Sequence, residues 1–438
     1  MKQITPVAKL ATYLSWLAAV IIALVPFHAF LTVWVASLAG HYTLLRLWKE
    51  FLLLPLVLGS LYLLARNKAL RRKFWSLTLT KLILAYFLLL IICAAVALAR
   101  HTVTAKAMWY GVLVDSRFLV FFLAIIIVAA SAKILRQNWL KLLMGPALLV
   151  AVVAILQYLV LPYDFLKHFG YNQNTIYPYE TINHNINHIR VMSTLRGANP
   201  LGAYIIVPLS VVTVGLTQRQ KVRGSGQILA GGLALALIFS FSRSAWLGAA
   251  LAITTAAWLC LKSDRLRHMA GWWAAGLVVL ACLLSLGLRN NHSFQDVFLH
   301  TDSASTIAQS SNQGHSAAFK SALKDIYHQP LGRGVGTAGP QSVYNNGRTR
   351  LAEDYFLQIG QEAGILGLIL FVAICAALAK LLYAQRRDPL ALALLASLIG
   401  LSLVNLLSHA WADDTLAYVF WGLAGIALAP LLASRKNT

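Results

Sequence analysis

Residues 77–99 read LTLTKLILAYFLLLIICAAVALA, and this segment decides the fold class. Lys81 is its only charged residue, and a helix of this length can cross the hydrocarbon core of a bilayer, which is about 30 Å thick. Similar apolar segments recur along all 438 residues, of which 59% are hydrophobic and 12% are charged. A water-soluble protein cannot bury so much apolar surface, and the segments lack the alternation of barrel strands. The sequence therefore predicts an all-α, polytopic integral membrane protein.

Windows of about 19 residues predict twelve membrane spans. These spans are residues 10–38, 45–66, 77–99, 110–131, 139–161, 198–217, 226–241, 244–261, 268–288, 356–383, 389–409 and 415–434. The boundary between the seventh and eighth spans depends on a single polar break, Ser242-Arg243-Ser244. No small-residue cleavage site follows the first apolar segment, so we expect a span there rather than a signal peptide.

The loops between these spans alternate in basic content. One side of the membrane receives the two N-terminal lysines and the loops RNKALRRK, AKILRQNWLK, QRQKVR, KSDRLRH, QRRD and SRK. The positive-inside rule makes this side the cytoplasm, so we expect a multi-pass protein of the inner membrane with both termini cytoplasmic. The net charge of +23 then reflects topology and contact with membrane lipid, not nucleic-acid binding.

Two segments on the predicted outer face, residues 162–197 and 289–355, are too long to be turns. The second divides the chain into a membrane domain of nine spans (1–288), an extracytoplasmic loop (289–355) and a membrane domain of three spans (356–438). Outer loops of this length are where we expect the functional site.

Two parts of the larger loop have recognisable patterns. HSAAFKSALKDIYHQ (315–329) carries apolar residues at helical spacing, which predicts an amphipathic helix lying over the membrane domain. PLGRGVGTAGP (330–340) contains the spacing G-x-G-x-x-G, but no βαβ unit surrounds it, so a dinucleotide cofactor is not expected. We expect a tight turn whose backbone amides, with Arg333, approach the oxygens of a ligand.

Ionisable residues also occur within or beside the predicted spans, where each is unfavourable unless paired or functional. Asp115 and Glu50 fit either a functional role or intramembrane ion pairing, and Arg117 lies two residues from Asp115. Arg243 has no acidic residue near it in sequence and is flanked by serines, which favours a functional role. The four cysteines lie singly in apolar runs, so no metal site is predicted.

The smaller outer loop ends in HIRVMSTLRGANPLGAYI (188–205). Arg190 and Arg196 precede the sixth span, and Asn199-Pro200 breaks the chain at its start. This arrangement can present guanidinium groups and helix N-terminal amides to an anion, although snorkelling of the arginines to lipid headgroups is an alternative.

Four blocks, in this order, resemble the O-antigen ligase and O-antigen polymerase superfamily of bacterial envelope glycan enzymes. They are RVMSTLRGANPLG (190–202), SRSAW (242–246), PLGRGVGTAG (330–339) and YFLQIGQEAGILG (355–367). The predicted twelve-span layout is also similar to that of the family. The resemblance implies an inverting, metal-independent glycosyltransferase without a cofactor, acting outside the cytoplasmic membrane. Its donor would be a glycan on undecaprenyl diphosphate, and its acceptor a sugar hydroxyl on a second lipid-linked glycan or on a lipid A core.

The resemblance also implies that Arg190 and Arg243 bind the diphosphate, and stabilisation of a departing diphosphate by fixed arginines is physically reasonable. Arg117, Arg196, Asn199, His315 and Arg333 are further candidates for substrate binding. We expect Glu362, which matches the glutamate of the family, to be structural and to pair with an arginine.

The chain departs from the family just before the tenth span. Many relatives have His-Asn there, whereas this chain has Glu353-Asp354. A carboxylate is a weaker base than histidine unless burial raises its pKa. Three interpretations remain open: Glu353 or Asp354 acts as the base, His315 supplies an imidazole, or the acidic pair anchors arginines such as Arg348 and Arg350.

A transporter, and in particular a flippase for lipid-linked glycans, is the main alternative. The chain shows no two-fold internal repeat of the kind found in many transporters, and a long outer loop suits an extracytoplasmic active site better. The sequence does not separate a polymerase from a ligase.

Overall fold

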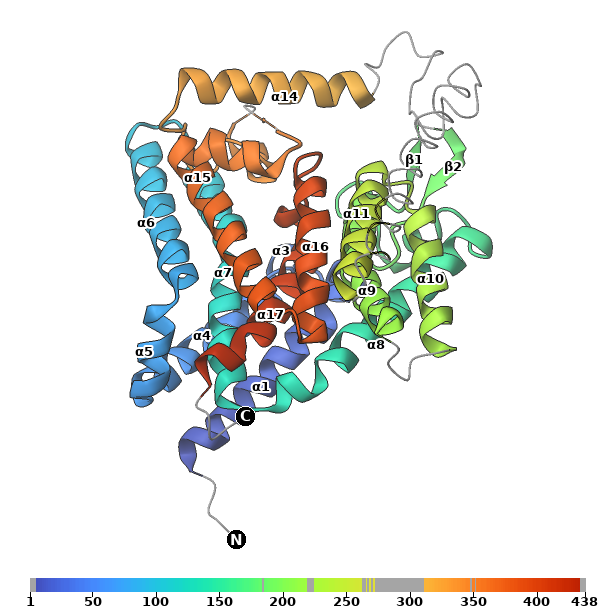
Figure 1. The fold of residues 1–438 in the computed structure, drawn as a ribbon. Coiled ribbons are helices and arrows are strands. Elements are labelled where there is room, and N and C mark those ends of the chain that lie inside the picture. The colour runs from blue at the N-terminus through green and yellow to red at the C-terminus, as the bar shows by residue number, and fades with distance from the viewer. Residues whose placement is uncertain are drawn as a thin grey trace.

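The computed structural model forms a bundle of long helices with one helix lying across an end of it (Figure 1). It describes residues 5–182, 185–218, 224–261, 265, 268, 271, 311–346, 349–350 and 352–433. For residues 187 and 311–315 it describes the backbone alone.

The helical elements follow one another with short connections. In chain order they are α1 (Pro6–Leu24), η1 (Val25–Phe27), α2 (His28–Ala39), α3 (Tyr42–Leu45), α4 (Trp48–Arg66), α5 (Lys68–Ser76), α6 (Thr78–Ala99), α7 (Ala105–Ser131), α8 (Ile134–Leu159), η2 (Phe165–Phe169), α9 (Ala198–Thr217), α10 (Ser225–Phe239), α11 (Arg243–Cys260), α14 (Ser311–His328), η4 (Pro340–Tyr344), α15 (Tyr355–Ala384), α16 (Pro389–Asn405), η5 (Ala410–Ala412) and α17 (Asp414–Leu432). The two strands are β1 (Glu180–Ile182) and β2 (Asn185–Arg190).

A helix lies at each predicted span that the structure describes, and the count of twelve spans stays a prediction. Eight helical segments are long and apolar enough to cross a membrane, and α10 and α16 are shorter apolar helices. The break predicted around residues 242–244 is present, because α10 ends at Phe239 and α11 begins at Arg243. The ninth predicted span, residues 268–288, lies outside the described residues apart from isolated positions. The chain is therefore a mainly helical, polytopic membrane protein.

The all-α prediction missed one small sheet. Strands β1 and β2 form an antiparallel hairpin in which Glu180 is paired with Arg190 and Thr181 with Ile189. The strands contain only three and six residues, too few to give a clear alternation in the sequence. The hairpin matters because it fixes the backbone of Arg190 opposite Glu180.

The best-buried helices lie in the middle of the bundle. α17 packs along α7, whereas α9, α11 and α16 pack against one another, and α10 packs on α8 and α9. At the contact of α11 with α16, a Cβ atom on Gly248 would lie 2.8 Å from the carbonyl oxygen of Gly400. Small residues let membrane helices approach this closely.

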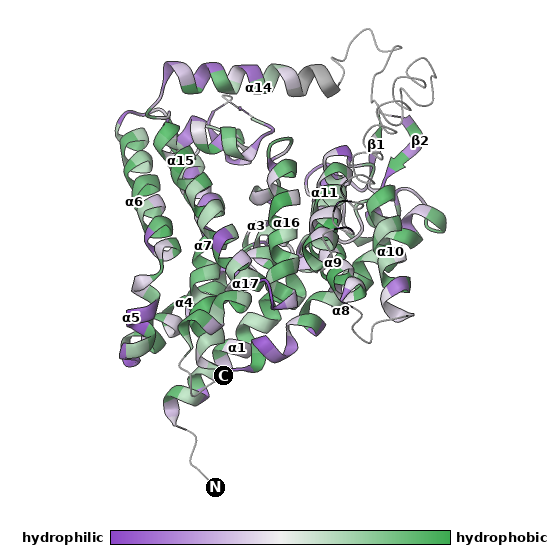
Figure 2. Cartoon of the chain, in the orientation of Figure 1, coloured by the Kyte–Doolittle hydropathy of each residue, from purple (hydrophilic) through white to green (hydrophobic). Residues whose placement is uncertain are grey.

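The two ends of the bundle differ in what they carry. The start of α1 and the end of α17 lie at one end, and α14 lies at the opposite end (Figure 1). Apolar residues cover most helices, while hydrophilic residues concentrate on α5 and α14 (Figure 2). Helix α14 confirms the predicted amphipathic helix, with Ala322 and Ile326 buried against Ala352 and Leu357.

Helix α15 is kinked, which the prediction of one continuous span missed. Gly364 has a φ of 70°, and the kink frees the carbonyl groups of the turn before it. The glycine-rich segment fills this gap, because the amide of Arg333 donates to Gln361 O (2.8 Å) and the amide of Gly334 donates to Glu362 O (2.9 Å). A Cβ atom on Gly364 would lie 2.3 Å from the carbonyl oxygen of Pro330, so glycine is required there.

Candidate functional site

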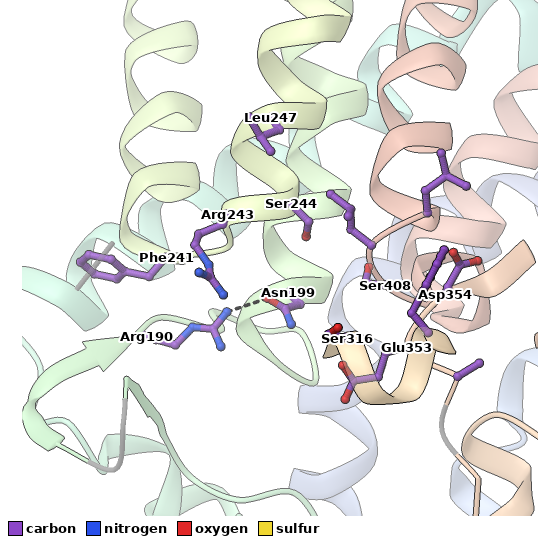
Figure 3. Close-up of a pocket in the computed structure, with 14 residues that line it drawn as sticks. Arg190, Asn199, Phe241, Arg243, Ser244, Leu247, Ser316, Glu353, Asp354 and Ser408 are labelled. Carbon is purple, nitrogen blue, oxygen red and sulfur yellow. Dashed lines mark hydrogen bonds between the residues drawn. The ribbon is translucent and has the colours of Figure 1, made fainter. Parts of the chain in front are cut away.

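A cavity with residues from several helices lies at the end of the bundle that carries α14. It has a volume of about 520 Å³ and is bounded by α9, α11, the end of α16, α14 and the segment before α15. Five residues singled out in the sequence line it together: Arg190, Asn199, Arg243, Glu353 and Asp354. In Figure 3 the two arginines lie on one side and the two acidic residues on the other.

Arg190 is fixed on three sides at the end of β2. Its Nε donates to Ser240 O (3.2 Å), its Nη2 donates to Asn199 Oδ1 (2.6 Å), and its Nη1 lies 3.7 Å from Glu180 Oε2. The amide of Val191 also donates to Phe239 O (3.0 Å), which ties the backbone to the end of α10. Burial lowers the pKa of Arg190, and the Glu180 carboxylate opposes this shift. The guanidinium is therefore held in a defined orientation at the cavity wall.

Arg243 is the first residue of α11 and lies beside Arg190 (Figure 3). The chain turns sharply before it, because Phe241 adopts a φ of 47° and the Ser242 amide donates to Ser240 Oγ (3.3 Å). The indole of Trp246 then donates to Leu237 O (2.8 Å) and joins α11 to the end of α10. The short polar break seen in the sequence thus directs a cationic side chain into the cavity.

Two helix N-termini reach the same wall. α9 begins one residue before Asn199 and α11 begins at Arg243. Among the described residues, the N-cap of α9 is Gly197, which has no side chain, and the Ser242 side chain at the N-cap of α11 accepts no amide of the first turn. Uncapped first-turn amides and the helix dipole both favour an anion. The arginine side of the cavity is therefore suited to bind phosphate groups.

The opposite side carries the acidic pair. Asp354 is the N-cap of α15, and its Oδ1 accepts the amide of Leu357 (2.9 Å). Its side chain is buried, and burial raises the pKa of Asp354 above the ordinary value despite hydrogen bonds from backbone amides. Glu353 is half-buried and has a φ of 56°, a conformation that is unfavourable for a residue with a side chain.

With this geometry in view, comparison with known families is informative. Residues 228–372 match the family model described as O-antigen ligase. The chain is similar to O-antigen ligases over this segment. The match covers about a third of the chain and confirms the resemblance to the O-antigen ligase and polymerase superfamily. No curated protein matches the chain.

The O-antigen ligase match includes Arg243, Glu353 and Asp354. It begins after Arg190 and Asn199 in the sequence and therefore does not include them. The cavity is therefore built from the matched segment and from residues outside it. An activity of the O-antigen ligase or polymerase type is supported by this match.

Helix α14 covers the cavity, and one aspartate holds the helix in place. Ser316 and Phe319 of α14 line the cavity. Asp325 accepts hydrogen bonds from Arg333 Nη2 (2.7 Å), Arg350 Nη1 (2.9 Å) and Gln361 Nε2 (2.9 Å). Arg333 thus binds Asp325 and is not among the residues that line this cavity.

The hydrogen bonds of Asp325 also bear on the three interpretations of Glu353 and Asp354. Arg350 is bound by Asp325, not by Glu353 or Asp354, and Arg348 lies outside the described residues. The side chain of His315 lies outside the described part as well. Asp354 caps α15, so anchoring of Arg350 is not its role.

The glycine-rich segment differs from the sequence expectation. The amides of Gly336 and Ala338 do not face a ligand, because both donate to Glu362 Oε1 at 3.0 Å. Gln341 Nε2 donates to the same oxygen at 2.9 Å. The prediction of ligand-binding amides is therefore wrong for this segment, and so is the expected arginine partner of Glu362. Instead, Glu362 fixes the turn against α15.

Arg117 lies away from the cavity in a buried group of charges. Its guanidinium pairs with Asp414 and with Glu50 Oε1 (3.4 Å), and Lys49 Nζ lies 3.1 Å from Glu50 Oε2 and 3.0 Å from Asp414 Oδ2. The ion-pairing interpretation is confirmed for Glu50. Asp115 instead accepts hydrogen bonds from Tyr355 Oη (3.2 Å) and Gln358 Nε2 (3.4 Å).

Arg196 lines a second, smaller cavity of about 220 Å³ beside the first. Its Nε lies 3.2 Å from Asp413 Oδ2, and Glu180 forms another part of the wall. Asn199 and Ser408 line both cavities. Sequence reasoning missed Glu180, Ser408 and Asp413, because no motif contains them and only the fold brings them to the same cavity.

Proposed function

We propose that this protein is a glycosyltransferase that moves a glycan from undecaprenyl diphosphate to a sugar hydroxyl, as a surface-polysaccharide polymerase or ligase. The site would face the outer side of the inner membrane, both termini would be cytoplasmic, and the reaction would need no metal ion or cofactor. The observation that carries the proposal is the single cavity in which Arg190 and Arg243 lie opposite Glu353 and Asp354.

The arginine side is assigned to the donor diphosphate. Two guanidinium groups and two uncapped helix N-termini supply positive charge and hydrogen-bond donors without metal coordination. Charge grows on the diphosphate as its bond to the sugar breaks, so fixed donors at this position stabilise the transition state. Arg190 is already oriented by Ser240 and Asn199, so little rearrangement is needed.

Asp354 is assigned as the general base. Its Oδ1 caps α15, and its Oδ2 remains to accept the proton of the acceptor hydroxyl. The hydroxyl oxygen bonds to the anomeric carbon while the bond from that carbon to the diphosphate oxygen breaks. The electron pair leaves with undecaprenyl diphosphate, and attack from the opposite face inverts the anomeric centre. The raised pKa of Asp354 makes it a stronger base than an exposed carboxylate.

The test uses purified protein in lipid nanodiscs with undecaprenyl-diphosphate-linked glycan and acceptor extracted from cells that lack the protein. Glycan transfer and release of undecaprenyl diphosphate are followed in the presence of EDTA. We expect activity to persist in EDTA and to fall by about 10²-fold or more in Arg243→Ala, as when an oxyanion-stabilising donor is removed.

Arg386→Gln is the matched control, because Arg386 stacks on Tyr383 at the end of α15 and lines neither cavity. Full activity of Arg243→Ala would refute the arginine assignment. If the protein in sealed liposomes moves the lipid-linked glycan across the bilayer without any transfer, the flippase alternative holds and the enzyme proposal is refuted.

A further inference from the structure

The smaller cavity is connected to the proposed reaction site but differs from it in composition. Asn199 and Ser408 form the shared boundary, and Asn199 Oδ1 binds Arg190 directly. Ser408 also lines the larger cavity together with Asp354, and Figure 3 shows it toward the side of the acidic residues. A group held in the smaller cavity therefore adjoins the cavity assigned to the leaving group and the base.

The volume and charge of the smaller cavity restrict what it can hold. Its volume of about 220 Å³ is less than that of pockets for drug-sized ligands, which begin at about 300 Å³, and suits a group the size of one sugar ring. Its ionisable side chains are two acids, Glu180 and Asp413, together with Arg196 and His409. The excess of negative charge disfavours a second phosphate, in contrast to the paired arginines next door.

The same side chains are well suited to sugar hydroxyl groups. Carboxylate oxygens accept hydrogen bonds, guanidinium nitrogens donate them, and the Asn199 amide does both. The side chains of Glu180 and Arg196 are 36% and 37% exposed, so both keep polar atoms accessible while Arg196 is oriented by the buried Asp413. Asp413 is itself fixed, because its Oδ1 accepts the amide of Thr415 (3.0 Å).

We propose, building on the proposed function, that the smaller cavity binds one sugar ring of the acceptor glycan, with Arg196 and Glu180 bonded to its hydroxyls. A ring held there would extend the reacting hydroxyl past Ser408 toward Asp354. A sugar of the donor glycan has the same chemistry, so the test separates the two sources.

The experiment measures two-substrate kinetics in the nanodisc assay, with donor and acceptor concentrations varied independently. Arg196→Gln and Glu180→Gln keep the side-chain size roughly constant, and Arg386→Gln is the control. We expect the KM for the acceptor to rise about tenfold or more in both variants, because bonds to charged partners are lost. The donor KM and the rate at saturating acceptor should change by less than about twofold in Arg196→Gln, whereas Glu180→Gln is judged on the acceptor KM, because Glu180 also pairs with Arg190.

An unchanged acceptor KM in both variants would overturn the inference, and a rise in the donor KM alone would assign the cavity to the donor glycan instead. If Arg196→Gln fails to fold, because its ion pair with Asp413 is lost, the half-exposed Glu180→Gln decides the outcome. The inference can fail while the proposed function stands. If Arg243→Ala is inactive and the smaller-cavity variants have unchanged kinetics, the acceptor assignment is refuted but the transferase proposal is not.

Discussion

Replacement of Glu362 by alanine tests whether this carboxylate builds the glycine-rich turn. Glu362 is fully buried, and its Oε1 accepts hydrogen bonds from Gly336 N, Ala338 N and Gln341 Nε2 at 2.9–3.0 Å. Glu362→Ala leaves all three donors without their acceptor. Each buried donor left unsatisfied destabilises the fold by roughly 1–3 kcal/mol, so we expect a loss of at least about 3 kcal/mol in the free energy of unfolding.

The measurement is equilibrium unfolding of the purified protein in mild detergent with increasing denaturant. Glu362→Gln retains an oxygen acceptor at the same place, so it should lower the free energy of unfolding by less than half as much as Glu362→Ala does. Asp388→Ala is the control, because this exposed carboxylate accepts one amide, that of Leu390, at the start of α16. Loss of such a cap costs about 1 kcal/mol. If Glu362→Ala is no less stable than Asp388→Ala, the anchoring role is refuted.

Three further substitutions test other parts of the structure. Asp354→Asn should lower the transfer rate by about 10²-fold or more. Because burial raises the pKa of Asp354, protonation should slow the wild-type enzyme at a higher pH than expected for an ordinary aspartate. The residual activity of the variant should lack this decrease at low pH. Asp414→Asn leaves Arg117 and Lys49 to share the Glu50 carboxylate, so one buried cation loses its counter-ion, and it should cost about 3–5 kcal/mol in denaturant unfolding. Gly202→Ala would bring a Cβ atom within 2.6 Å of the Ala245 side chain and should weaken donor binding by separating α9 from α11, whereas Gly231→Ala, with open space around it, should bind donor normally.

The membrane helices could be predicted from the sequence because their signal is local. A run such as residues 77–99 needs only its own apolar side chains to become a span, and the helix found there is Thr78–Ala99. The β-hairpin and the kink at Gly364 were missed for a physical reason. Each depends on a specific backbone contact, Arg190 opposite Glu180 and Pro330 beside Gly364, that the spacing of apolar residues does not reveal.

The sequence predicted part of the candidate site, because a polar residue in an apolar chain is also a local signal. Arg190, Arg243 and Asp354 stand at element ends, where polar residues in an apolar chain are conspicuous, and the cavity brings them together. Arg333 looked equally conspicuous, yet it binds Asp325 of α14. The sequence shows that a charged group needs a partner but not whether that partner is a substrate or another side chain.

Three helix N-termini meet at the larger cavity, and they differ in how their positive ends are balanced. α15 is capped by its own carboxylate, Asp354, whereas the first turns of α9 and α11 receive no side-chain cap from Gly197 or Ser242 within the described chain. On the proposed mechanism, the donor diphosphate supplies negative charge to α9 and α11, whereas the negative charge at α15 is part of the protein. On the proposed mechanism, a diphosphate turned toward α15 would meet Asp354 and Glu353 and be repelled. The donor can bind productively only with its diphosphate at the arginines and its anomeric carbon toward the base.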